Sequence, residues 1–106
     1  MRLRQGRFDE LVERQLDLFS TDESALLHEA DEAEAAWVRA GRDEAEESYG
    51  DFQLVVDAIA DGLLEIREAY ASTLDADATE EYRGAYHRAV ARRFRRYSSV
   101  VADLEP

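Results

Sequence analysis

Apolar residues recur along this chain at intervals of three and four positions, which is the spacing of one face of an α-helix. The longest stripe is unbroken, and its members are Ala45, Tyr49, Phe52, Val56, Ile59, Leu63, Ile66 and Tyr70. Shorter stripes with the same spacing begin at Phe8, Leu26 and Tyr82. No segment shows a convincing alternation of apolar and polar residues, as a half-buried strand would. The pattern therefore predicts an all-α protein.

Polar residues mark where these helices are expected to begin. A Ser or Asp followed three residues later by Glu can pair with two of the free backbone N–H groups in a first helical turn. This arrangement occurs at Ser20, Asp43 and Asp77, each near the point where an apolar stripe restarts. We therefore predict four helices, over residues 7–19, 21–40, 43–73 and 77–101.

The boundary between the second and third helices has two interpretations. The third stripe restarts one residue out of phase with the second, and a tight turn at Gly41 with Asp43 as the next cap would explain this shift. One long helix with a local irregularity would explain it as well. The sequence leaves both interpretations open.

The predicted fold is a four-helix antiparallel up-down bundle that forms a single domain over residues 1–106, because short connections make sequential helices antiparallel. The third helix would be about 45 Å long at 1.5 Å per residue, and longer than its neighbours. Something has to cover its excess length, and a second copy of the chain is the simplest candidate. The candidate dimer interface consists of Tyr49, Phe52, Val56, Ile59, Leu63, Ile66 and Tyr70.

Composition narrows the class of protein. The chain has 106 residues and no cysteine, so neither a disulfide framework nor a thiolate metal site is possible. No apolar run approaches the roughly 20 residues of a membrane-spanning helix. The charged start MRLRQGRFDEL lacks the apolar stretch of a signal peptide. We therefore expect a soluble, cytoplasmic protein without membrane contact.

The charge is strongly negative, with 25 acidic residues against 13 basic ones and a formal net charge of −12. Every basic residue is Arg. Most of such a surface repels nucleic acid and anionic membranes. Either a high-GC genome or a salt-rich cytoplasm would account for the acidity, and the sequence does not decide between them.

One basic segment stands out near the C-terminal end, where Arg92, Arg93, Arg95 and Arg96 surround Phe94. Basic and aromatic residues that alternate in this way can form a nucleic-acid-binding surface. Cations also suit the last turns of a helix, and the acidic middle of the chain offers many internal partners. We favour the internal role and keep nucleic-acid binding as a third hypothesis.

A loose family resemblance covers residues 27–60. The segment HEADE supplies Glu29 and Glu32, and EESYGDF supplies Glu47 and Asp51. These motifs resemble those of the MazG-like nucleotide pyrophosphohydrolases, all-α enzymes in which carboxylates of two neighbouring helices hold magnesium over a nucleoside triphosphate. The resemblance implies a Mg²⁺ or Mn²⁺ site at these four residues. Glu47 and Asp51 are four positions apart where the family has three, and Ser48 occupies the position of a ligand Glu.

The patterns together favour a non-catalytic structural or protein-interaction module without a cofactor, which self-associates or binds another helical protein. A divergent MazG-like pyrophosphohydrolase is the alternative. The five tyrosines fall on apolar stripes, so we expect them in the core or at an interface. His28 and His87 are both expected at the surface.

Overall fold

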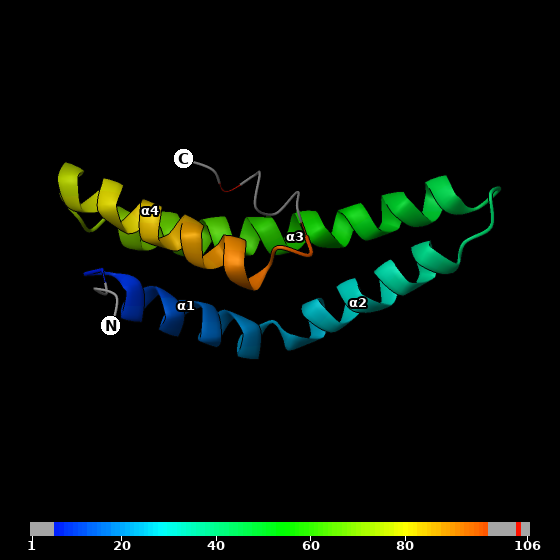
Figure 1. The fold of residues 1–106 in the computed structure, drawn as a ribbon, viewed down its shortest axis with the longest axis horizontal. Coiled ribbons are helices and arrows are strands. Elements are labelled where there is room, and N and C mark those ends of the chain that lie inside the picture. Colours follow the sequence, from blue (N-terminus) through cyan, green and yellow to red (C-terminus); the bar gives the residue numbers. More distant parts are fainter. Residues whose placement is uncertain (1–5, 98–103, 105–106) are drawn as a thin grey trace, which may run out of the picture.

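The computed structural model of the protein describes residues 6–97 and 104. Over these residues it contains four α-helices and no strand (Figure 1). Their bounds are Asp9–Asp22 (α1), Ser24–Arg39 (α2), Ala45–Ala71 (α3) and Ala76–Arg93 (α4). The predicted all-α four-helix bundle is confirmed. The predicted fourth helix was too long, because α4 ends at Arg93; residues 98–101 lie outside the described part.

α1 and α2 follow one another end to end, as Figure 1 shows. Glu23 alone separates them, and the backbone hydrogen bonds continue across it, from the Glu23 N–H to the Phe19 carbonyl (2.8 Å) and from the Leu27 N–H to the Glu23 carbonyl (3.0 Å). α3 then runs back along both helices, and α4 folds over the second half of α3 and packs against α1 (Figure 1). Two of the sequential pairs are therefore antiparallel, whereas α1 and α2 form one bent rod.

α2 and α3 are separate helices. Ala40 has an extended backbone with ψ of 138°, which ends α2. The N–H of Glu44 then donates to the Gly41 carbonyl at 3.0 Å, and α3 begins at the next residue. The interpretation of residues 21–73 as one long helix is therefore wrong.

The predicted capping residues are wrong at all three positions. Ser20 lies inside α1, and neither α2 nor α3 has a side-chain cap at its start. α4 is capped by Asp75 rather than Asp77, and the Asp75 carboxylate accepts a hydrogen bond from the Ala78 N–H at 2.8 Å. Asp75 has the extended backbone that a cap requires, whereas Asp77 lies in the first helical turn.

The predicted apolar stripes form the core. The largest fully buried side chains come from α1, α3 and α4 and from the C-terminal end: Tyr82, Tyr86, Leu16, Ile59, Leu63, Leu104, Val12, Val56 and Val90. Four members of the candidate dimer interface, Phe52, Val56, Ile59 and Leu63, are at most 7% exposed. They belong to the core of the chain itself and are not available to a partner in this fold.

The reason is the end-to-end arrangement of α1 and α2. Together these two helices are as long as α3, so α2 covers the first half of α3, and α1 and α4 lie beside the second half (Figure 1). No excess length of α3 needs a second copy to cover it. Of the remaining interface candidates, Tyr49 is exposed, and Ile66 and Tyr70 are partly buried against the core.

A buried arginine joins the C-terminal end of the chain to α3. Arg67 is only 8% exposed, and its guanidinium donates to the Leu104 carbonyl at 2.7 Å and to the Glu68 carboxylate at 2.8 Å. Glu68 also accepts hydrogen bonds from Arg83 on α4. The Arg83 hydrogen bond, with help from Arg67, holds the pKa of Glu68 below its usual value of 4.5. This network compensates a charge that would otherwise be costly to bury.

Candidate functional site

Two of the arginines near the C-terminal end form ion pairs with acids of other helices in the same chain. Arg93 forms ion pairs with Asp17 at 2.8 Å and with Glu13 at 3.5 Å. Arg96 contacts Glu34 at 2.6 Å and Asp31 at 3.2 Å, and the hydrogen bond to Glu34 raises the pKa of Arg96. These pairs tie the end of α4 and the residues after it to α1 and α2.

The other two arginines of the predicted basic patch are less engaged. Arg92 lies 3.3 Å from Glu13, and the pair is exposed. Arg95 is exposed, and no ion pair connects it to another residue of the described part. Most of the basic patch is therefore matched by acids of α1 and α2 rather than offered to solvent.

The predicted metal-binding residues come partly together. Glu29 and Glu32 of α2 and Asp51 of α3 line a single hollow of about 570 Å³, which Ser48 also lines. Glu47 is exposed and is not among the lining residues. Over the described residues, no three His, Cys, Asp or Glu side chains come together closely enough to hold a metal ion. Glu32 instead lies 3.7 Å from His28 on the surface of α2.

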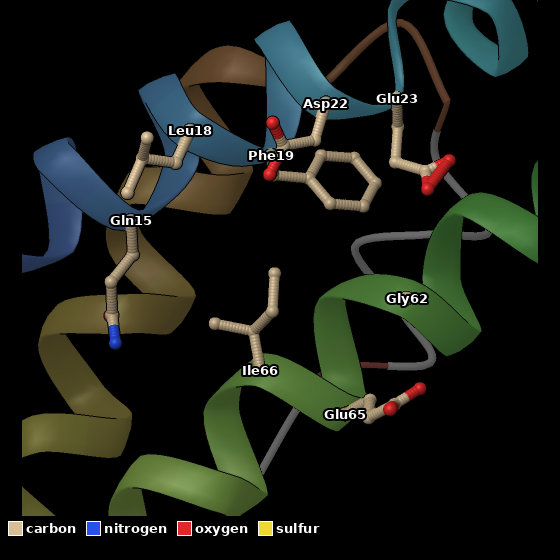
Figure 2. A pocket seen from close by; sticks show the side chains of 8 residues that line it. All are labelled: Gln15, Leu18, Phe19, Asp22, Glu23, Gly62, Glu65 and Ile66. Carbon is tan, nitrogen blue, oxygen red and sulfur yellow. The ribbon is translucent and has the colours of Figure 1, made fainter.

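A second hollow, of about 400 Å³, opens between α1 and α3. Figure 2 shows Phe19 and Ile66 pointing into the space between the two helices. Leu18 lines the same hollow and is 59% exposed. The complete lining is Gln15, Leu18, Phe19, Asp22, Glu23, Gly62, Glu65 and Ile66. This hollow therefore combines an apolar floor with an acidic rim.

Gly62 sets the distance between α1 and α3 at this point. A Cβ atom on Gly62 would lie 2.9 Å from the Phe19 ring, closer than real Cβ contacts. Gly50, the other glycine of α3, faces open space. The close approach of two elements thus occurs at a glycine that sequence reasoning did not single out.

Both hollows lie on one face of α3. Ser48 and Val55 line the first, Gly62 lines the second, and the three positions are seven residues apart, which is two helical turns. We call the two hollows together the α3 groove. The two hollows share no lining residue, and together they occupy α3 from Ser48 to Ile66, which is about 27 Å at 1.5 Å per residue. α2 borders one end and α1 the other.

The acids around the hollow between α1 and α3 have no basic partner among the described residues. Asp22, Glu23 and Glu65 are exposed, and none of them pairs with a basic residue over residues 6–97. Glu13, Asp17, Asp31 and Glu34, on the side that faces α4, are paired with arginines. The two sides of the α1–α2 rod therefore differ in charge. On the side that faces α4, the acids are paired with arginines; on the side of the groove, Asp22 and Glu23 have no basic partner among the described residues.

Most of the tyrosines are structural, as expected. The Tyr86 hydroxyl donates to the Leu63 carbonyl at 2.6 Å, and the Tyr82 hydroxyl contacts Gln15 at 2.9 Å. Burial raises the pKa of Tyr82 to about 12 and that of Tyr97 to about 12, and it also raises the pKa of Tyr86. Tyr49 differs from these, because it is 45% exposed and packs against Trp37 with ring centroids 4.8 Å apart.

The two histidines have different environments. His28 is exposed, as predicted. His87 is half-buried rather than at the surface, and its Nδ1 atom is buried without a hydrogen-bond partner within the described part of the chain. The expectation that His87 lies at the surface was therefore wrong.

Comparison of the chain with protein-family models, curated proteins and solved structures finds no match. Among the described residues, no helix is both long and apolar enough to cross a membrane. The function is therefore argued from the α3 groove itself.

Proposed function

We propose that this protein is a non-catalytic helical-bundle module that binds another protein through the α3 groove. The observation that carries the proposal is the groove itself, where an apolar floor lies open between helices. Leu18 at one end and Leu54 at the other are 59% and 70% exposed. Apolar grooves rimmed by polar residues are typical of protein-binding surfaces. We place this activity in the cytoplasm.

The carboxylates of the groove suit recognition better than turnover. Glu29, Glu32 and Asp51 are exposed and separate, and hydrolysis of a triphosphate needs metal ligands that converge on one point. Exposed carboxylates at the edge of an apolar strip instead guide a charged partner and fix its orientation.

The MazG-like pyrophosphohydrolase is a second candidate, because one observation favours it. Glu29, Glu32 and Asp51 share a single hollow between two antiparallel helices. An assay with nucleoside triphosphates and Mg²⁺ or Mn²⁺ tests it, with the Asp51→Asn variant as control. We expect no monophosphate to form; turnover that disappears in Asp51→Asn would replace the proposed function with this one.

Affinity purification of the tagged protein from its native cells tests the proposed function. The Leu18→Asp variant places a charge on the groove, and Val38→Asp places the same charge on an exposed valine outside it. Val38 is nine positions after Glu29, which places it about 180° around α2 from the groove. We expect a partner to co-purify with the wild type and with Val38→Asp, and to be lost with Leu18→Asp.

Circular dichroism serves as the folding control, and both variants should show the helicity of the wild type. Because Leu18 and Val38 are 59% and 75% exposed, neither replacement should unfold the chain. A partner retained equally by both variants would contradict the assignment of the groove as the binding surface.

A further inference from the structure

We infer that the partner segment is a cationic amphipathic helix, which lies along the α3 groove with its apolar face on Phe19 and Ile66. This inference rests on the proposed function and specifies the chemistry of its ligand. Three observations support it: the length of the groove along α3, its borders, which are helices without a free backbone edge, and its unpaired acids.

The length and surroundings of the groove favour a helix. A helix of about 18 residues is about 27 Å long at 1.5 Å per residue, so it would reach from one hollow to the other along α3. An extended peptide would bring unpaired backbone N–H and C=O groups against an apolar floor, which is unfavourable without a sheet edge to receive them. The helices that border the groove offer no such edge, because their backbone groups are paired within each helix. A helix satisfies its own backbone groups and presents only side chains.

The charges specify the sign of the partner. Asp22 and Glu23 stand on one side of the groove and Glu65 on the other, and none of the three has a basic partner in the described structure. Lys or Arg residues that flank the apolar face of the incoming helix would lie opposite these carboxylates. A helix flanked by acids would be repelled.

A second copy of this chain does not supply such a helix. The chain carries a net charge of −12, and its basic segment at the end of α4 is already paired with Glu13, Asp17 and Glu34. The apolar face of α4 is buried in the core through Tyr82, Tyr86 and Val90. Pairing two grooves face to face would bring unpaired acids together. The occupant is therefore a different, basic protein.

A panel of synthetic peptides of about 18 residues tests the inference, a length that matches the groove at 1.5 Å per residue. The first peptide has Leu at helical spacing on one face and Lys on both flanks. The second peptide has Gln in place of each Lys, and the third has Glu in place of each Lys. The fourth peptide has the composition of the first in a scrambled order, so that it keeps the charge but has no apolar face. Binding is followed by ¹H–¹⁵N spectra of the full chain, in which the amide of Gly62 reports on the groove.

We expect the Lys peptide to shift the resonances of Gly62, Leu18 and Ile66, and to bind at least about tenfold more tightly than each of the other three. Its affinity should fall with added salt, because exposed charges are screened. The Glu65→Arg variant should weaken binding by about tenfold. Glu80→Arg, which reverses an exposed acid of α4 outside the groove, should leave binding unchanged.

Each other result contradicts a different part of the argument. Equal binding of the scrambled peptide would show attraction by charge alone and overturn the inference. Equal binding of the Gln peptide at the groove would overturn the charge selection while the proposed function stands. If no peptide moves the groove resonances, the inference fails, and the proposed function fails with it if Leu18→Asp also keeps the native partner. Groove resonances that change with protein concentration, together with a dimer mass in light scattering, would make a second copy the occupant and overturn the inference.

Discussion

Gly62 is the residue whose size decides how closely α3 can lie to Phe19. Any side chain at this position would meet the ring at 2.9 Å, and the ring is held by burial and by an edge-on contact with Phe94 at 6.1 Å between centroids. The floor of the α3 groove therefore depends on the absence of one methyl group. Gly50, in the same helix, carries no such constraint.

Replacing each glycine by alanine separates these two roles. Alanine is the better helix former by about 1 kcal/mol, so Gly50→Ala should raise the free energy of unfolding by up to that amount. In Gly62→Ala the same gain is opposed by an overpacking cost of about 1–3 kcal/mol, so we expect a net loss of about 1 kcal/mol. Urea unfolding of both variants measures the difference. Stabilisation of similar size in both would mean that the ring moves freely and that Gly62 does not set the spacing.

Glu68 makes the stability of the fold depend on pH in the acid range. Its pKa is lowered by hydrogen bonds from Arg83 and Arg67, so the folded state holds its charge more firmly than the unfolded chain does. The stabilisation is present above the unfolded pKa of 4.5 and is lost as the pH falls through the lower folded value.

The Glu68→Gln variant should therefore be less stable than the wild type at pH 7. The difference in stability between the two proteins, which we call the gap, should be smaller at pH 3. Thermal unfolding at both pH values measures it. Glu29→Gln, which changes an exposed glutamate in the middle of α2 that has no basic partner among the described residues, is the matched control and should show no such narrowing. A gap for Glu68→Gln that stays constant from pH 7 to pH 3 would contradict the lowered pKa.

At the scale of the elements, the start of α4 depends on a side-chain cap. The Asp75 carboxylate accepts a hydrogen bond from the Ala78 N–H, whereas Asp77 lies in the first turn of the helix and only benefits from the helix dipole. We expect Asp75→Ala to lower the free energy of unfolding by about 1 kcal/mol. Asp77→Ala should lower the free energy of unfolding by a smaller amount, about 0.3–1 kcal/mol at most. Chemical denaturation ranks the two variants, and a larger loss for Asp77→Ala would restore the capping residue that the sequence pattern suggested.

The elements also show which features of the fold the sequence could predict. Burial of Val12, Leu63 and Tyr86 follows from helical spacing alone, because the apolar face of a helix has to be covered whatever lies opposite. The path of the chain at Glu23 does not follow from such spacing. A connection of one residue, without Gly or Pro, can either reverse the chain or let it continue, and tertiary packing decides which. The predicted dimer interface depended on a reversal there.

The candidate site was less predictable for a related reason. The pattern HEADE and EESYGDF indicated that Glu29, Glu32 and Asp51 lie on neighbouring helices, and they do line one hollow. Whether they converge depends on side-chain directions and on the distance between α2 and α3, which residue spacing does not fix. Only two weak features of the sequence point to the hollow beside Phe19: a glycine within an apolar helix face, and Leu18 off the apolar stripe of its helix.

At the scale of the whole molecule, the bent rod of α1 and α2 produces both the core and the α3 groove. The dimensions of 50 × 34 × 23 Å describe an elongated body, with two hollows beside α3. Arg92, Arg93 and Arg96 pair with acids on the other side of the rod. We propose that a protein with this distribution of charge binds a partner through its acidic, partly apolar face.

Site-specific photo-crosslinking in the native cells tests that claim most directly. A photoreactive amino acid replaces Leu18, Leu54 or Val38 in turn. All three side chains are exposed and apolar, but only Leu18 and Leu54 line the groove. We expect positions 18 and 54 to capture the same protein through a basic helical segment, and position 38 not to capture it. Identical products from all three positions, or none from positions 18 and 54, would contradict it.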